Sequence, residues 1–260
     1  MPPVHKRIPV VVQGRRTRRR LAARALWTGA ELAVTLGAVA LLLVVHQLWW
    51  TNRQAQHAAR DQVTRLERQW DARPATPPPP GPSAAPAPAG DRARRAPPSD
   101  RAAADAAPPR HDRAYAVLRI PRIGLTVPVA QGVGRSAVLN KGYVGHYPGT
   151  AQPGATGNAA LAGHRNTHGE PFRHLDRLRP GDTVTVDTAG ARYTYAVRRT
   201  LARTTPGDAT VLAAVPYSSV HPAYRFTAPD AYLTLTTCTP QYTSTYRLVV
   251  WAVLQSARSR

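Results

Sequence analysis

An apolar run near the N-terminus places the first constraint on what this chain can fold into. Residues 32–50 read LAVTLGAVALLLVVHQLWW, and residues 25–30 extend the run on its N-terminal side. About 20 apolar residues of helix span the hydrocarbon core of a bilayer, where backbone polar groups must be satisfied within the segment. The run therefore predicts one membrane-spanning helix over residues 25–50, with Trp49 and Trp50 at a membrane interface.

The charge around this run predicts its orientation. Residues 1–24 carry eight Lys/Arg and no acid, whereas only Arg53 follows the run closely. Positive charge gathers on the cytoplasmic side, so we expect a cytoplasmic N-terminus and an extracytoplasmic remainder. A basic block alone also suits a nucleic-acid arm, but its place beside the span favours the membrane and no nucleic-acid partner. A cleaved signal peptide is the alternative; the run is longer than usual for one, and no small-residue cleavage site follows.

A second compositional change separates the span from the rest of the chain. Pro, Ala and Arg dominate residues 71–112, which contain almost no large apolar side chains. Such a segment buries too little surface to offset the entropy of ordering, so we expect a disordered tether. The predicted organisation is a basic cytoplasmic segment, an anchor, an extracytoplasmic stalk that includes the tether, and one exported domain, at residues 1–24, 25–50, 51–112 and 113–260.

The exported domain has the pattern of a mostly β protein. Short apolar or alternating runs are bounded by Gly and Pro, which indicates many short strands and a closed barrel or sandwich. The expected strands are 114–120, 125–130, 158–162, 182–187, 193–197, 231–237 and 246–254. Short helical turns are expected at 170–178 and 210–215.

Cys238 is the only cysteine, and it ends the predicted strand 231–237 just before Pro240. A single unpaired thiol in an exported protein is a candidate reactive group, and a strand end makes its side chain accessible. The alternative is a small buried hydrophobe, which is a common role for a free cysteine.

His164 follows another predicted strand, within Leu161-Ala-Gly-His164-Arg165. It is a candidate general acid and base, with a loop histidine as the plain alternative. A metal site with His168 needs both rings on one helix face, and Gly163 and Gly169 argue against a helix here. The sequence also lacks a dense acidic cluster for calcium. We therefore predict no metal and no cofactor.

Arg247 begins the strand that follows Cys238 through a short loop. If the two strands are neighbours, the guanidinium reaches the same groove. A guanidinium always carries its charge and offers several donors, so it suits a developing oxyanion. A surface arginine on a strand is the alternative.

Together these residues resemble the sortases, which are membrane-anchored cysteine transpeptidases of Gram-positive bacteria. The resemblance rests on Thr-Leu-Thr-Thr-Cys at 234–238, Gly-His-Arg at 163–165, and Arg247 on the next strand. It covers about residues 115–254. Gly-His-Tyr-Pro-Gly at 145–149, Pro171-Phe172 and the Trp49-Trp50 edge are similar to the actinobacterial class E branch.

The resemblance implies an eight-stranded β-barrel with short helices and a two-step reaction. The Cys238 thiolate would cleave the Thr–Gly bond of a Leu-Ala-x-Thr-Gly-like C-terminal sorting signal on surface proteins, forming a thioester. His164 would serve as general acid and then as base, while Arg247 would hold substrate or oxyanion. The implied acceptor is an amino group of a peptidoglycan precursor.

Substrate contacts and alternative functions complete the expectations. Tyr147, Thr236 and Thr237 are the candidate substrate-binding residues, although the two threonines also suit simple strand packing. A pilin-polymerising sortase uses the same chemistry, but that branch typically carries a second span and a lid motif, which we do not find in this sequence. A non-catalytic, membrane-tethered β-domain that binds envelope components is the third alternative.

Overall fold

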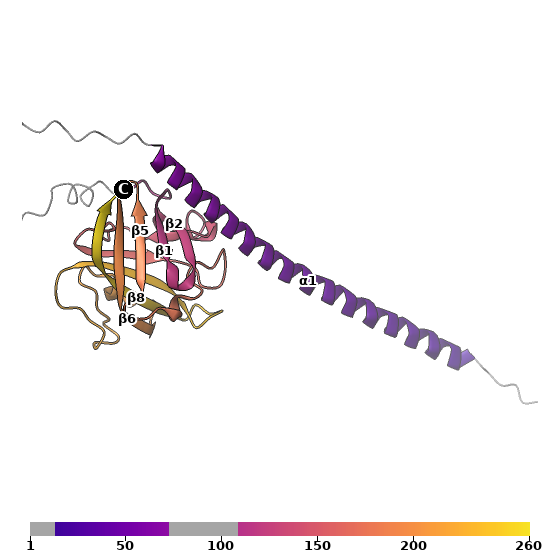
Figure 1. Ribbon diagram of the computed structural model, residues 1–260. Coiled ribbons are helices and arrows are strands. Elements are labelled where there is room, and N and C mark those ends of the chain that lie inside the picture. Colours follow the sequence, from indigo (N-terminus) through magenta and orange to yellow (C-terminus); the bar gives the residue numbers. More distant parts are fainter. Residues whose placement is uncertain (1–13, 73–108) are drawn as a thin grey trace, which may run out of the picture. The chain divides into compact units, whose positions relative to one another are not determined.

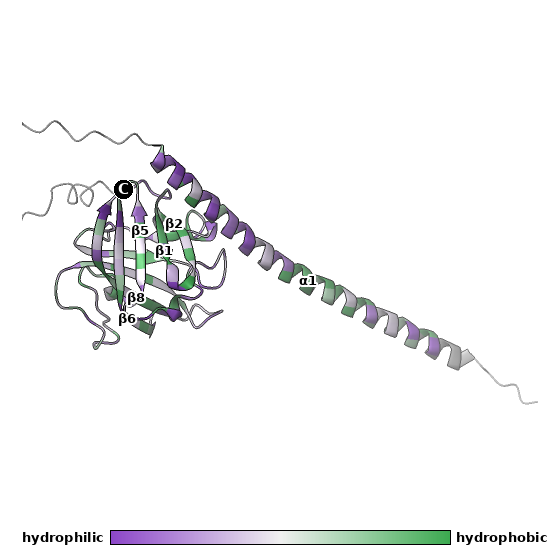
Figure 2. Cartoon of the chain, viewed as in Figure 1, coloured by the Kyte–Doolittle hydropathy of each residue, from purple (hydrophilic) through white to green (hydrophobic). Residues whose placement is uncertain are grey.

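A computed structural model describes residues 14–72 and 109–260. The chain divides into two compact units, Met1–Trp49 and Trp50–Arg260. Helix α1 (Gly14–Asp71) begins in the first unit and ends in the second. In the first unit its apolar side chains are exposed, and they form the hydrophobic stretch visible in Figure 2. This is the one helix in the described part of the chain whose length and composition suffice to cross a membrane.

The second unit contains a closed eight-stranded barrel (Figure 1). Its strands follow one another around the barrel in the order β1-β2-β3-β4-β7-β8-β6-β5, and β1 pairs with β5 to close it. The pairs β2–β3 and β4–β7 are parallel, and the other neighbours are antiparallel. The strands are β1 (Ala114–Ile120), β2 (Leu125–Gln131), β3 (Val144–His146), β4 (Gly157–Ala162), β5 (Thr183–Thr188), β6 (Ala191–Thr204), β7 (Ala231–Thr239) and β8 (Tyr246–Ser259). The expected eight-stranded barrel is confirmed.

The strand boundaries differ from the sequence pattern at three places. Strand β3 has only three residues, too few to show an alternation, and was not expected. Strands β6 and β8 have 14 residues each and pair along their length, with register shifts that interrupt the period-two pattern of β6. The helical segments are single 3₁₀ turns: η1 (Pro121–Ile123), η2 (Leu139–Lys141), η3 (Leu175–Arg177) and η4 (Ala209–Leu212).

The main core fills the barrel interior. Alternate residues of β7 and β8, such as Leu233, Leu235, Leu248 and Val250, belong to one buried cluster with the inward side chains of the other strands. Their neighbours Val249 and Trp251 instead pack with Leu201 and Val211 in a smaller cluster on the outer face. Because successive side chains on a strand point to opposite faces, this division tells which residues of β7 and β8 lie outside the barrel.

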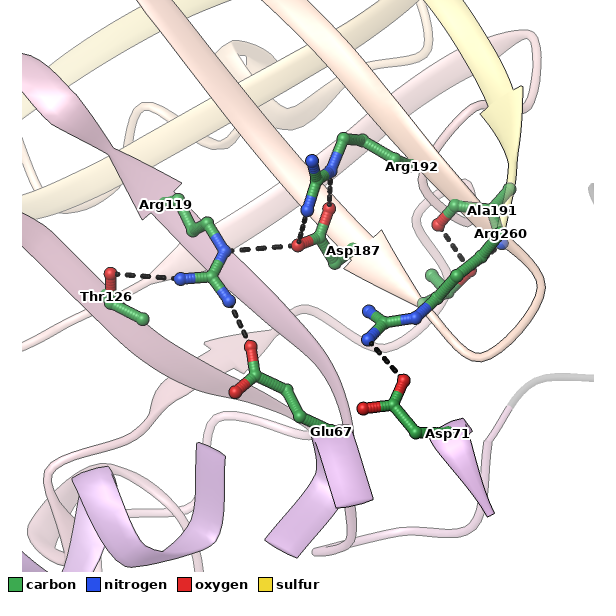
Figure 3. Close-up of polar contacts among 9 residues, drawn as sticks. Glu67, Asp71, Arg119, Thr126, Asp187, Ala191, Arg192 and Arg260 are labelled. Atoms are coloured by element: carbon green, nitrogen blue, oxygen red, sulfur yellow. Dashed lines mark hydrogen bonds and ion pairs between the residues drawn. The ribbon is translucent and has the colours of Figure 1, made fainter. Parts of the chain in front are cut away.

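The last turns of α1 pack on the barrel. Ala59 lies in a buried cluster with Tyr143, and Val63 and Leu66 pack against Val117 of β1. Polar contacts continue this seam (Figure 3): Arg119 of β1 pairs with Glu67 of α1 and with the buried Asp187 of β5, and Arg260 pairs with Asp71. Residues 52–71, placed in the stalk by the sequence pattern, are thus part of the barrel unit because one side of this helix is apolar. Most of the predicted tether, residues 73–108, lies outside the described residues.

Candidate active site

Three neighbouring strand ends bring the predicted catalytic residues together. Parallel pairing matches Ala162 of β4 with Thr236 of β7, and the bond from Gly163 N–H to the Thr236 carbonyl continues it. His164 and Cys238 each follow these partners by two residues. Antiparallel pairing places Cys238 opposite Arg247 of β8. Adjacent strands lie about 4.8 Å apart, so the register brings the three residues close together at neighbouring strand ends.

The cluster lies on the outer face of the barrel. Leu233 and Leu235 point into the core, and alternation therefore directs Thr236 and Cys238 outward. Arg247 has the same parity as Val249 and Trp251, which pack outside the barrel. Cys238 is partly exposed and forms no disulfide. The thiol therefore lies at the outer surface of the barrel, at the ends of β4, β7 and β8.

The ring of His164 is held from two sides. Its Nε2 lies 2.9 Å from the side-chain oxygen of Asn140, at η2, and its ring stacks on His168 with centroids 5.2 Å apart. Since an amide oxygen only accepts, Nε2 carries a proton and Nδ1 of the neutral ring is left as an acceptor. Burial, together with smaller contributions from His168 and Arg135, lowers the pKa of His164 from 6.5 to about 4. The resting imidazole is therefore neutral at pH 7.

Arg247 is oriented by its own loop. Its Nη1 donates to the carbonyl oxygens of Ser244 and Tyr246, each at 2.9 Å. The neighbouring Arg203 lies over the Tyr246 ring, 4.7 Å from its centroid. Among the contacts of the described residues, Nε and Nη2 of Arg247 have no other partner.

Arg165 holds the backbone at Cys238 by hydrogen bonds. Its side chain is 7% exposed, and Nη1 donates to the Cys238 carbonyl at 3.3 Å and to the Thr239 hydroxyl at 2.8 Å. Asp176 pairs with the same guanidinium at 3.2 Å. This contact ties the turn after β4 to the end of β7, which keeps the His164 and Cys238 backbones in fixed relation.

The candidate substrate-binding residues differ in their surroundings. The Tyr147 hydroxyl lies 3.3 Å from that of Thr236, on the outer face beside Cys238. Thr236 is nearly buried and donates to the Leu161 carbonyl. Thr237 points inward, is buried, and donates to the Gly163 carbonyl at 2.8 Å. Its position on the opposite face from Cys238 leaves it a structural role, because adjacent residues of a strand face opposite ways.

Two histidines of the sequence motifs have different roles. His146, beside Tyr147, is fully buried, and its ring contacts the Tyr115 hydroxyl, Gln131 and the Ala151 carbonyl. Burial lowers its pKa to about 4, although the Ala151 contact opposes this shift, so it is a neutral core residue. His168 and His164 lie face to face, yet no group of three metal-ligating residues is found in the described ranges.

Sequence reasoning missed Asn140, Arg165 and His168 as neighbours of the site. Asn140 precedes His164 by 24 residues in a loop without a regular pattern, so nothing local marks it. Arg165 belonged to the recognised Gly-His-Arg turn, and its burial was the missing information. His168 was considered only as a metal ligand.

Comparison with known proteins identifies related sequences. Residues 118–255 match the family model of the sortase domain. The chain is 36% identical to Sortase SrtE1 of Streptomyces coelicolor over 245 residues, which cover 92% of this chain and 59% of that protein. It is 31% identical to Sortase SrtE2 of the same organism over 248 residues, covering 93% and 87%.

Solved structures give the same result. The crystal structure of Sortase E1 from Streptomyces coelicolor, which has a tripeptide in its active site, is 43% identical with a TM-score of 0.54 and covers 57% of this chain and 92% of its own. Sortase E from Streptomyces avermitilis is 39% identical with a TM-score of 0.51, covering 58% and 93%.

Proposed function

Because the chain belongs to the sortase family, we propose that it is a membrane-anchored cysteine transpeptidase that cleaves a C-terminal sorting signal and joins the released protein to a cell-wall amine. The observation that carries this proposal is the register of β4, β7 and β8, which gathers His164, Cys238 and Arg247 on one outer face. The tripeptide in the active site of the Streptomyces coelicolor enzyme supports a peptide substrate.

In the first step Nδ1 of neutral His164 takes the proton of the Cys238 thiol, and the resulting thiolate attacks the carbonyl carbon of the Thr–Gly bond in a Leu-Ala-x-Thr-Gly-like signal. The carbonyl oxygen becomes an oxyanion, to which Nε and Nη2 of Arg247 can donate. As the C–N bond breaks, protonated His164 gives its proton to the leaving amine. The products are a thioester on Cys238 and a free peptide tail that begins with glycine.

In the second step an acceptor amine attacks the thioester carbonyl. Neutral His164 takes the proton of the attacking amine, the C–S bond breaks, and the Cys238 thiolate is restored. A peptidoglycan precursor supplies the amine in this proposal. The span at residues 25–50 anchors the enzyme, with the N-terminus cytoplasmic and the barrel extracytoplasmic.

The test uses the full chain in lipid nanodiscs with a fluorogenic Leu-Ala-x-Thr-Gly peptide. We expect cleavage between Thr and Gly, and with hydroxylamine present a C-terminal Thr hydroxamate, which requires a thioester intermediate. Cys238→Ala should abolish both products. Equal cleavage by that variant, or a wild-type chain that yields no hydroxamate, would refute the thioester mechanism. No cleavage at all by the wild type would favour a non-catalytic envelope-binding domain.

A further inference from the structure

The two side chains that contact the His164 ring are carried by two separate loops. Asn140 accepts a hydrogen bond from Nε2 and belongs to η2, between β2 and β3. His168 stacks on the same ring and belongs to the loop after β4. The orientation of His164 therefore depends on the position of both loops.

The loop that carries His168 has a backbone that needs external support. His168 and Glu170 have φ of 52° and 50°, and Gly169 between them has φ of 85°. Left-handed backbone is disfavoured for residues with a side chain, so two such residues in succession around a glycine persist only when neighbours hold them.

One turn of α1 supplies that support. The side-chain oxygen of Asn52 accepts from the Gly169 N–H at 2.5 Å, and the side-chain amide of Gln56 donates to the Gly169 carbonyl at 3.4 Å. Both backbone groups of the central residue are thus held by side chains four positions apart, on one face of the helix.

The same turn also contacts the loop of Asn140. Gly142 directly follows η2, and a Cβ added there would lie 2.8 Å from the Ala55 carbonyl oxygen and 3.3 Å from the His168 carbonyl oxygen. Ala55 is buried. Helix and both loops therefore meet at a point where only glycine fits.

The helix is fixed to the barrel at a distance from this point. Ala59, Val63 and Leu66 continue the buried face, and the Glu67–Arg119 pair at its far end connects to buried Asp187 (Figure 3). A rigid helix clamped along its length can hold the loops at its other end in place.

We propose that the turn Asn52–Gln56 of α1 is a positioning element for the active site, which holds His164 through Gly169 and Gly142. This inference rests on the function proposed above, since it assumes that His164 is the proton-transfer residue. Asn52 and Gln56 are positioning residues, because they act through the loops and do not contact the ring. The segment that leaves the anchor is thereby part of the catalytic apparatus.

The test compares the full-length wild-type chain with the double variant Asn52→Leu/Gln56→Leu, both in nanodiscs. Leucine keeps the helix but removes both contacts with Gly169. We expect kcat for peptide cleavage to fall about 10- to 100-fold with a smaller change in KM, because a displaced proton-transfer group affects the reaction more than binding. Asn52→Asp keeps an acceptor for the Gly169 N–H, so this single variant should retain most of the wild-type kcat. Gln54→Leu, at an exposed position on the same turn, is the matched control.

A second readout does not depend on turnover. NMR titration of the His164 ring, assigned with His164→Gln, should show a pKa near 4 in the wild type. In Asn52→Leu/Gln56→Leu it should move up by about one unit towards 6.5, since looser loops admit water. His168 and Arg135, which also lower the His164 pKa, remain in both proteins. The acidic limb of the kcat/KM profile should shift in the same direction.

The outcomes are separable. An inactive wild-type chain refutes the proposed function, whereas the ring titration still reports whether α1 acts on His164. An unchanged titration with unchanged kcat overturns the positioning role. A loss of kcat in Gln54→Leu equal to that in the double variant also overturns it. A loss of the same size in Asn52→Asp has the same meaning. If the double variant melts below the assay temperature, Gln56→Leu alone provides the comparison, because it removes only the contact with the Gly169 carbonyl.

Discussion

Asp208 is the residue whose replacement gives the most direct test of the forces that hold the loop between β6 and β7. Its carboxylate accepts from the hydroxyls of Thr204, Thr210, Ser218 and Ser219 at 2.5–3.0 Å, and from the Ser219 N–H at 3.1 Å. The side chain is almost fully buried. One charge therefore fastens both ends of a loop segment that lies over the outer face of β7.

The magnitude follows from the pKa of this carboxyl group. Burial raises the pKa, but the hydrogen bonds from Ser218, Thr204, Thr210 and the Ser219 backbone outweigh burial and lower it from 3.8 to about 2. A pKa difference of one unit corresponds to about 1.4 kcal/mol, so the ionised form stabilises the fold by about 2 kcal/mol. Because the folded pKa is the lower one, this stability is fully present above pH 4 and is lost as the pH falls towards 2.

We expect Asp208→Asn to lower the free energy of unfolding of the barrel unit by about 2 kcal/mol at pH 7, which corresponds to a Tm decrease of about 4–8 °C for a unit of this size. Near-UV circular dichroism of the full chain in detergent micelles follows the transition. At pH 2.5 the difference from the wild type should shrink to less than half. Asp230→Asn, at an exposed position of the same loop, should change Tm by less than about 1 °C.

Two results would refute this reasoning. A variant within about 0.5 kcal/mol of the wild type at pH 7 would show that neutral donors and acceptors replace the charge without loss. A difference of full size that persists at pH 2.5 would show that the amide distorts the loop, because protonation of Asp208 in the wild type would then be irrelevant.

Two further substitutions test the immediate surroundings of the site. Asn140→Ala removes the acceptor for His164 Nε2, so kcat for peptide cleavage should fall about 10-fold or more. Thermal melting should show little change in Tm. An unchanged kcat would show that Asn140 does not contribute to the site. Gly163→Ala places a Cβ 2.7 Å from the Phe172 ring, so the free energy of unfolding in urea should drop by about 1–3 kcal/mol. The end of β4 should move, so kcat should also decrease. A variant as stable as the wild type would show that the Phe172 ring moves aside without cost.

Much of the fold was predictable because its strands are bounded by Gly and Pro and carry apolar residues. The alternation in β5 and the apolar runs of β7 and β8 predicted strands at nearly their observed places. Strand β3 was not predictable, because three residues show no period and its pairing with β2 and β4 comes from the tertiary structure. The residues that β6 adds beyond 193–197 depend on pairing with β8 through register shifts.

The site was predictable only where chemistry marks a residue by type. Cys238, His164 and Arg247 stood out, and their register supports the roles proposed for them. Asn140 and Arg165 are ordinary polar residues whose importance comes from what they touch. The packing of α1 on the barrel is predictable from a pattern in the sequence. Apolar residues recur there at spacings of four, four, three and four, as on the apolar face of a helix. They are Ala55, Ala59, Val63, Leu66 and Trp70.

The parallel pairing of β4 with β7 has a consequence for the order in which the molecule forms. The β7–β8 hairpin joins neighbours in sequence, so Cys238 and Arg247 meet early and at small loop-closure cost. The β4–β7 pair instead closes a loop of 74 residues, which includes β5 and the whole of β6. Contacts of such sequence separation form slowly. We therefore expect the pairing of Cys238 with Arg247 to form before the β4–β7 pairing brings His164 beside them.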